Sequence, residues 1–364
     1  GNQGGRVQSA ADLTINTAGQ DIDNRATAGS GGLLAAGKLQ LDGGVLDNRG
    51  GAVNAQGDAR LLLARVDNSG GGTLASSADL SLQAASLANA SGRVQAGRNL
   101  DLTLAGHLDN AAGAIAAGQR LTLTAASVDN RNTRGGDGTR GLQAGQLQFG
   151  AQWLDNSQGQ IVTDGGARLQ INGQLQNTGG VISTGGNLDS QADNVANSGG
   201  LLRADGSQTL VARALSEDGQ VHAQRDLGLT LQQGMRQRGE WIANGTLSLN
   251  LSGDLDNQGV VRGGNLDLNA QNITNATSGE ISSQGTTHLN ARGQLTNRGL
   301  IDGALTHLEA GEIDNLGTGR IYGDRVAIST GVLKNRAEEA GGATRVGTVA
   351  ARERLDLGVR ELQN

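Results

Sequence analysis

The sequence of 364 residues contains no cysteine and no proline, and it has only 1 Phe, 1 Tyr, 2 Trp and 1 Met. Without cysteine, disulfides cannot stabilise the fold. Proline lacks the N–H that a sheet needs, so its absence is typical of a chain built almost wholly from central strands. So few large side chains cannot fill a broad globular core. Any core must therefore be thin and built from Leu, Ile, Val and Ala.

The sequence also lacks any segment dominated by charge of one sign. Its 29 Lys and Arg are interspersed with 35 Asp and Glu, which gives a net charge of −6. The chain has no basic stripe of the kind that binds nucleic acid, so we expect no nucleic-acid partner. No apolar run approaches the roughly 18 residues of a membrane-spanning helix, so we expect no membrane-spanning segment.

The feature that the sequence does contain is an internal repeat. The tripeptide aliphatic-x-Asn recurs along the chain, and Glu217 and Gln237 stand in the same phase where Asn is expected. Its Asn residues are Asn24, Asn48, Asn68, Asn89, Asn110, Asn130, Asn156, Asn177, Asn197, Asn257, Asn275, Asn297, Asn315, Asn335 and Asn364, with Asn2 opening the series. The 362 residues from Asn2 to Asn364 form 17 intervals of about 21 residues, which is the length of one solenoid coil.

Within one interval the apolar residues alternate, as at Ile115 and Ala117 and again at Leu121 and Leu123. Alternation with period two predicts strands whose aliphatic side chains face inward. Combined with the longer period, it predicts an all-β fold, a parallel β-helix that winds three short strands per coil around an axis. We expect residues 1–364 to form a single domain, an unbranched rod of about 17 coils and roughly 80 Å. Loop excursions are expected near residues 131–140 and 336–347.

The recurring Asn predicts a column of side-chain amides, because stacked amides can donate and accept along the axis and satisfy backbone groups at the turn. We interpret this column as structural rather than as a ligand site. The ladder residues are Asn48, Asn68, Asn89, Asn110, Asn130, Asn156, Asn177 and Asn197. Gly pairs that follow the Asn, such as Gly179-Gly180, predict a corner with positive φ.

Asp precedes the recurring Asn in two runs of consecutive marks, at Asp23, Asp47 and Asp67 and again at Asp109, Asp129 and Asp155. In a parallel stack, carboxylates of adjacent coils lie roughly 5 Å apart. One interpretation is that each Asp accepts a hydrogen bond from its own turn. The alternative is that mutual repulsion raises the pKa values or recruits cations.

Candidates for contact with a partner lie on the first excursion and at two aromatic positions. The excursion carries Arg131, Arg134 and Arg140, and insertions in solenoids often map to the binding face. A solvated surface loop is the simpler interpretation.

Trp153 and Trp241 both precede aliphatic residues that we place inward, so alternation predicts outward-pointing rings. An exposed Trp could contact a glycan, a receptor or a neighbouring rod.

Constellations for catalysis or metal binding are not found in the sequence. The four histidines, His107, His222, His288 and His307, are scattered over separate coils without short metal-ligand spacing. No nucleophile elbow of the G-x-S-x-G type occurs. The stretch Gly135-Gly136-Asp137-Gly138 resembles a calcium-binding nonapeptide, but that motif binds in tandem arrays and occurs once here. We therefore predict no catalytic, cofactor-binding or metal-binding residues and no enzyme activity.

The unit Leu46-Asp47-Asn48-Arg49-Gly50-Gly51-Ala52-Val53-Asn54-Ala55 resembles the haemagglutinin repeats of filamentous haemagglutinin and the shaft repeats of contact-dependent growth inhibition exoproteins. The resemblance covers essentially all of residues 2–364. It implies a right-handed β-helical shaft of a secreted bacterial cell-surface protein, which displays adhesive or toxin domains after two-partner secretion. It also implies an outer-membrane two-partner secretion transporter, reached through an N-terminal domain not seen here, and a receptor or glycan on a host or target cell. We expect the chain to be a segment excised from a longer protein.

A second function class is a carbohydrate-active enzyme, a polysaccharide lyase or hydrolase, because many of these enzymes also use parallel β-helices. Such an enzyme needs a groove walled by long loops, aromatic residues for sugar stacking, and a pair of carboxylates or a metal. The few aromatic rings and the regular repeat favour a structural and interaction protein.

Overall fold

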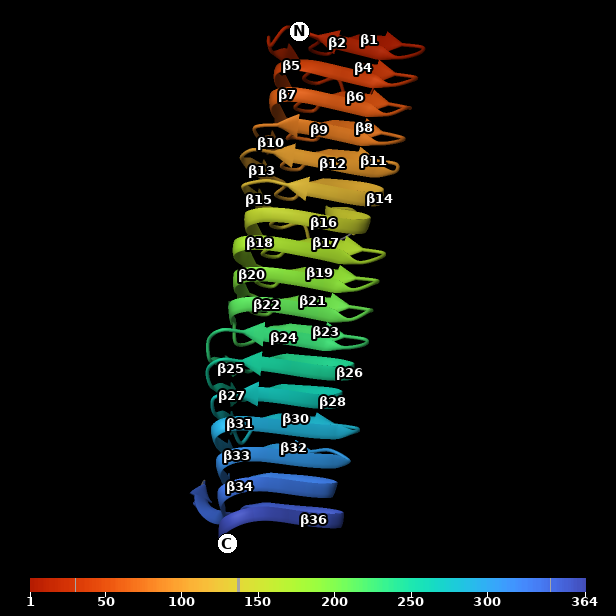
Figure 1. Cartoon of the computed structure of the whole chain (residues 1–364). Coiled ribbons are helices and arrows are strands. Elements are labelled where there is room, and N and C mark those ends of the chain that lie inside the picture. The colour runs from red at the N-terminus through yellow and green to blue at the C-terminus, as the bar shows by residue number, and fades with distance from the viewer. Residues whose placement is uncertain (30, 136–137, 341) are drawn as a thin grey trace. The chain divides into compact units, whose positions relative to one another are not determined.

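Residues with alternately buried and exposed side chains form strands that pair in parallel with strands of adjacent coils. Figure 1 shows these strands along the chain. The computed structural model describes residues 1–29, 31–135, 138–340 and 342–364. The chain divides into two units, Gly1–Ala192 and Asp193–Asn364. Over their described residues, the two units contain about 16 turns of a parallel β-solenoid. The all-β, parallel solenoid fold predicted from the repeat is confirmed.

The first unit contains β1 (Arg6–Ser9), β2 (Leu13–Asn16), β3 (Ile22–Asp23), β4 (Gly32–Ala35), β5 (Leu39–Asp47), β6 (Ala52–Ala55), β7 (Ala59–Asp67), β8 (Thr73–Ser76), β9 (Leu80–Ala84), β10 (Leu87–Ala88), β11 (Arg93–Ala96), β12 (Asn99–Leu104), β13 (His107–Asp109), β14 (Ala114–Thr124), β15 (Ser127–Asp129), β16 (Gly141–Asp155), β17 (Gln160–Thr163), β18 (Ala167–Gln176) and β19 (Val181–Thr184). Strand β20 (Leu188–Ala196) includes the boundary between the units.

The second unit continues with β21 (Leu201–Ala204), β22 (Gln208–Leu215), β23 (Gln220–Ala223), β24 (Leu227–Leu231), β25 (Met235–Gln237), β26 (Glu240–Leu251), β27 (Leu255–Asn257), β28 (Val260–Ala270), β29 (Ile273–Asn275), β30 (Glu280–Ser283), β31 (Thr286–Asn297), β32 (Leu300–Asp302), β33 (Leu305–Leu316), β34 (Arg320–Ala340), β35 (Ala343–Val346) and β36 (Thr348–Gln363).

The core of each unit consists of columns of identical or similar aliphatic residues. In the first unit, β12 pairs with β9 and β14 so that Leu100 lies between Leu80 and Leu121. The exposed fraction of these three side chains is at most 1%. Burying a Leu side chain stabilises the fold by roughly 1.5–3 kcal/mol. The two Leu residues that cover Leu100 come from the coils before and after it, so a single coil cannot bury its own Leu side chains. The stability of each coil therefore depends on the coils stacked on it.

The turn after the column Asn needs two unusual positions. The residue two places on has positive φ, whether it is Gly, as at Gly179 (φ 60), or not, as at Ala112 (φ 54). In several of these turns the residue three places on is a Gly that approaches the adjacent coil closely, because a Cβ on Gly113 would lie 2.3 Å from the carbonyl oxygen of Asn89. The predicted positive-φ corner thus involves the first Gly of each pair, whereas the second Gly is required by close packing between coils.

A shorter turn in the second unit shifts the inward phase by one residue. Gly239 follows Gln237 by two residues rather than three, and its Cβ position would lie 2.0 Å from the carbonyl oxygen of Gly219. Trp241 consequently pairs with the inward Val221 and is only 2% exposed. The prediction that Trp241 points outward is wrong. It assumed that the turn before Trp241 has the same length as the turns of the first unit, whereas this turn is one residue shorter.

The two excursions differ in structure. The first, near residues 131–140, contains the Gly135–Gly138 stretch, of which residues 136 and 137 lie outside the described residues. The second, near 336–347, includes an antiparallel hairpin, in which the end of β34 pairs with β35. The guanidinium of Arg298 donates two hydrogen bonds of 2.8 Å to the carboxylate of Glu338. This ion pair ties the hairpin to the solenoid wall.

Candidate functional site

A column of buried side-chain amides runs through the first unit. Each Nδ2 donates to the Oδ1 of the next Asn at 2.6–2.8 Å. The members of this column are the half-buried Asn2 and the buried Asn24, Asn48, Asn68, Asn89, Asn110, Asn130, Asn156 and Asn177. Several amides also donate to a backbone carbonyl one coil on, as Asn48 does to Thr73 at 3.1 Å. The column therefore joins adjacent coils and satisfies turn carbonyls.

In the second unit the amide column is interrupted. Glu217, which the repeat places in the column, is exposed, and its carboxylate contacts Arg238 Nη1 at 3.2 Å. A buried carboxylate would carry an uncompensated charge and could not donate to the next amide. Gln237 is buried, but its Oε1, like the Oδ1 of Asn257, accepts no hydrogen bond in the described structure.

On either side of this interruption, the Nδ2 atoms of the predicted Asn residues donate hydrogen bonds to a backbone carbonyl or to the next amide of the column. The Nδ2 of Asn197 donates to the carbonyl of Gln220 at 3.1 Å. From Asn257 onward the amide-to-amide bonds resume at 2.7–2.8 Å. This later stretch contains Asn257, Asn275, Asn297, Asn315, Asn335 and Asn364.

The six Asp residues singled out in the sequence, Asp23, Asp47, Asp67, Asp109, Asp129 and Asp155, accept hydrogen bonds from their own turns. In all six, Oδ1 accepts the backbone N–H two residues on, at 2.9–3.3 Å, as the local-turn interpretation predicts. Three coils add an Arg two residues after the Asp. Arg131, for example, lies 2.6 Å from Asp129 and 3.6 Å from Asp155 of the next coil. Arg25 and Arg49 bridge adjacent Asp residues in the same way.

These Arg residues set the electrostatics of the Asp column. Hydrogen bonds from the side chain and then the backbone of Arg25 lower the pKa of Asp23 to about 2. Burial raises the pKa of Asp129, but hydrogen bonds from Arg131 outweigh it and hold this pKa below its ordinary value. Charge at these two carboxylates is therefore balanced by protein cations, so neither of the two needs a bound metal ion to remain ionised.

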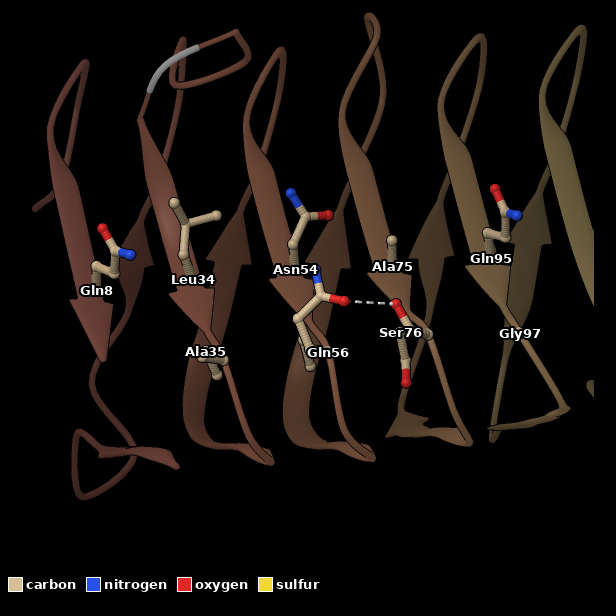
Figure 2. A pocket seen from close by; sticks show the side chains of 12 residues that line it. Gln8, Leu34, Ala35, Asn54, Gln56, Ala75, Ser76, Gln95 and Gly97 are labelled. Carbon is tan, nitrogen blue, oxygen red and sulfur yellow. Dashed lines mark hydrogen bonds between the residues drawn. The ribbon is translucent and has the colours of Figure 1, made fainter. Parts of the chain in front are cut away.

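A hollow lies on the outward face of β1, β4, β6, β8 and β11 (Figure 2). Its volume is ≈ 720 Å³. The strand register aligns Gln8, Leu34, Asn54, Ala75 and Gln95 across it. The residues that line the hollow include amides, hydroxyls and small aliphatic groups but no carboxylate. This lining can hydrogen-bond a neutral polar ligand, but it lacks the carboxylate pair that glycoside hydrolysis requires.

A smaller hollow of ≈ 460 Å³ borders the first excursion and shares Gln95 with the larger one. The three predicted Arg residues of that excursion do not converge on it. Arg131 is paired with Asp residues, and Arg134 Nη1 donates to the carbonyl of Gly179 at 2.8 Å. The carbonyl of Arg140 accepts from Gln160 Nε2 at 2.8 Å. The described contacts of this loop are with its own solenoid wall.

The two Trp and four His residues occupy different environments. Trp153 is 36% exposed and lies between Ser127 and Gln174 in the strand register, so only this Trp remains available for a partner. His107 contacts Ser127 Oγ at 2.8 Å, and His222 lies 3.7 Å from Glu240. Neither of these two histidines has another histidine as its partner in the strand register.

His288 and His307, in contrast, are brought side by side by the register of β31 and β33. Sequence reasoning treated them as scattered because they belong to different coils. The signal was available, because their separation of 19 residues is close to one coil. Residues one period apart in a solenoid are neighbours in space.

The chain was compared with known proteins. The Haemagglutinin repeat family model matches residues 1–112, 95–149, 137–212, 203–259, 261–299 and 328–364, and it describes a repeat rather than an enzyme. The chain is 33% identical over 110 residues to Toxin CdiA of Yersinia pestis, a match covering 30% of this chain and 3% of that protein. The chain thus spans a small part of this relative's length.

No solved structure shows significant similarity to the chain. Within the described residues, no helix has the length and hydropathy needed to cross a membrane. The matched family segments cover most of the sequence, and the parallel coils explain why the same unit recurs at one-coil intervals. This chain is a member of the haemagglutinin-repeat family.

Proposed function

We propose that this chain is a non-catalytic shaft segment of a longer, secreted bacterial surface exoprotein. The shaft holds adhesive or toxin domains away from the cell for contact with a host or neighbouring cell. The observation that carries this proposal is the buried amide column, in which hydrogen bonds of 2.6–2.8 Å join successive coils of the first unit. A spacer needs such a coil-to-coil bond, because its length is then set by the number of repeats.

The partners of the proposed shaft follow from its family. An outer-membrane transporter of the two-partner secretion type would export the parent protein, and a receptor or glycan on the target cell would bind its displayed domain. The similarity to a protein named as a toxin supports delivery to a neighbouring cell. The exposed Trp153 and the amide-lined hollow are the surfaces of this chain that could add a lateral contact.

A deletion of one whole coil tests the proposal. Removing residues 110–129 from the parent exoprotein joins Asp109 to Asn130 and preserves both the amide column and the inward phase. We expect secretion and target-cell contact to persist with a slightly shorter shaft. Loss of contact activity in a protein that is still folded and secreted would contradict a spacer role for this coil.

The matched control removes residues 110–119, half a coil. It should disrupt folding, because it brings outward residues into the inward columns. Incubating the purified chain with polyuronates and neutral polysaccharides tests the enzymatic alternative. Release of reducing or unsaturated sugars would support a carbohydrate-active enzyme instead.

A further inference from the structure

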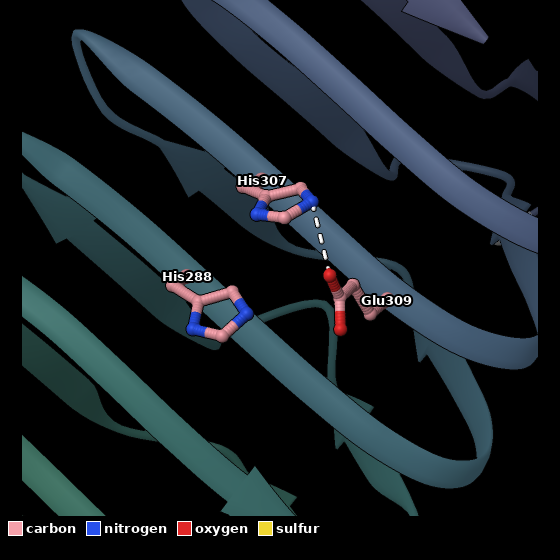
Figure 3. A group of neighbouring side chains, drawn as sticks. All are labelled: His288, His307 and Glu309. Carbon is pink, nitrogen blue, oxygen red and sulfur yellow. Dashed lines mark ion pairs between the residues drawn. The ribbon is translucent and has the colours of Figure 1, made fainter. Parts of the chain in front are cut away.

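Two imidazole rings stack on the outward face of the second unit (Figure 3). His288 of β31 and His307 of β33 are register partners, and their ring centroids are 5.1 Å apart with an interplanar angle of 21°. Parallel strands in register project equivalent side chains in the same direction. The ring nitrogens of the two residues therefore lie on one patch of surface.

A carboxylate completes this cluster. Glu309 follows His307 by two residues, so alternation places it on the same outward face. Its Oε1 lies 3.2 Å from His307 Nε2. One ligand atom from each of His288, His307 and Glu309 can be chosen so that all lie within 4.8 Å of one another. All three side chains are half-buried, which limits their motion.

A second carboxylate orients one of the rings. Asp267, from the adjacent strand β28, has its Oδ1 3.0 Å from His288 Nδ1. This contact favours the proton on Nδ1 and leaves the lone pair of Nε2 free. The Nε2 atom of His288 is buried and has no hydrogen-bond partner in the described structure. A buried polar atom without a partner requires an explanation, and an Asp–His pair with a free Nε2 is the usual arrangement behind a metal-binding His.

We propose that His288, His307 and Glu309 bind a divalent transition cation such as Zn²⁺, with Asp267 as the positioning residue of His288. Two imidazoles and one carboxylate suit Zn²⁺, Ni²⁺ or Cu²⁺ rather than Mg²⁺ or Ca²⁺, which prefer oxygen ligands. Tetrahedral coordination at the usual Zn–N distance of roughly 2.0–2.1 Å places two nitrogens about 3.3 Å apart. The ligand atoms, now within 4.8 Å, need to approach by about 1.5 Å at most.

Binding would rearrange the existing contacts in a defined way. The Glu309 carboxylate would move from His307 Nε2 onto the cation, and both imidazoles would bind in their neutral form. The fourth coordination position would hold water or a donor from another molecule. Because the ligands come from β31 and β33 of adjacent coils, the cation would cross-link these coils and stabilise them as a ligand stabilises any folded state that it binds selectively.

Titration of the full chain with Zn²⁺, followed by calorimetry and equilibrium dialysis, tests the proposal. We expect one saturable site that is lost in His288→Gln, His307→Gln and Glu309→Gln. The Asp267→Asn variant should bind about 10–100-fold more weakly. His107→Gln and His222→Gln are matched controls on other coils and should bind as the unaltered chain does. Circular dichroism without metal would show that each variant folds.

Two readouts on the unaltered chain keep the test independent of variant folding. Co²⁺ should give the visible absorption of a four-coordinate nitrogen and oxygen site, and Zn²⁺ should slow hydrogen exchange in β31 and β33 but not in β9 or β12. The proposal is overturned if the unaltered chain has no saturable site, or if binding persists when the three ligands are replaced together in a folded chain. It is also overturned if the exchange of distant coils slows equally.

Discussion

Replacing Asn110 by Leu removes one amide from the buried column while keeping a side chain of similar size. Asn110 accepts a hydrogen bond from Asn89 Nδ2 at 2.7 Å and donates to Asn130 Oδ1 at 2.8 Å. Both neighbours are fully buried. The substitution therefore breaks two bonds without admitting water to replace them.

The expected loss follows from what each neighbour retains. Asn130 Oδ1 loses its donor in a position without solvent, which costs about 1–3 kcal/mol. Asn89 Nδ2 keeps the carbonyls of Gly92 and Ala114, at 3.4 and 3.2 Å, so its loss is nearer to about 0.5–1.5 kcal/mol. Together these losses lower the free energy of unfolding of the surrounding coils by about 1.5–4.5 kcal/mol.

The interruption of the column provides a matched control. Gln237 donates only a long bond, 3.3 Å, to the carbonyl of Val260, and its Oε1 has no partner in the described structure. Gln237→Met should change stability by less than about 1 kcal/mol, because it loses one weak bond and removes an unsatisfied acceptor. Urea unfolding, with hydrogen exchange resolved by peptide, measures both variants. Equal destabilisation by the two substitutions would refute the assignment of stability to the amide-to-amide bonds.

Three further predictions concern the core, the turn and the Asp column. Leu123→Asp should destabilise by about 3–5 kcal/mol, because it buries an unpaired charge, whereas Thr122→Asp on the outward face should cost below about 1 kcal/mol; similar urea midpoints would show that the inward phase is wrong. Gly113→Ala should cost about 1–3 kcal/mol, because its Cβ would lie 2.3 Å from a backbone oxygen; an unchanged midpoint would contradict this close approach. The pKa of Asp129 is lowered in the folded state, so its stabilisation is present above the ordinary value of 3.8 and is lost as pH falls through the lower folded pKa. Urea midpoints of Arg131→Gln and the unaltered chain should therefore converge below about pH 4, and a constant difference down to pH 2 would exclude this linkage.

Much of the fold could be predicted from the sequence because it depends on local geometry. Side-chain alternation has period two in any strand, so Leu121 and Leu123 could be placed inward from their spacing alone, and both are fully buried. The recurring Asn identified the turn, since an amide can donate and accept within a stack. The bond from Asp129 to its own turn also involves residues only two positions apart.

Other features depended on how one coil meets the next, and only the tertiary structure decided them. A turn shorter by one residue inverted the phase at Trp241, and a charge that cannot be buried turned Glu217 outward. His288 stacks on His307 because the strand register pairs these two residues, which are 19 positions apart in the sequence. Contacts between coils depend on the length of every turn between them. A turn that is one residue longer or shorter moves each following side chain to the opposite face of its strand. The sequence by itself determined the repeat and its inward columns, whereas the tertiary structure determined which outward side chains lie together.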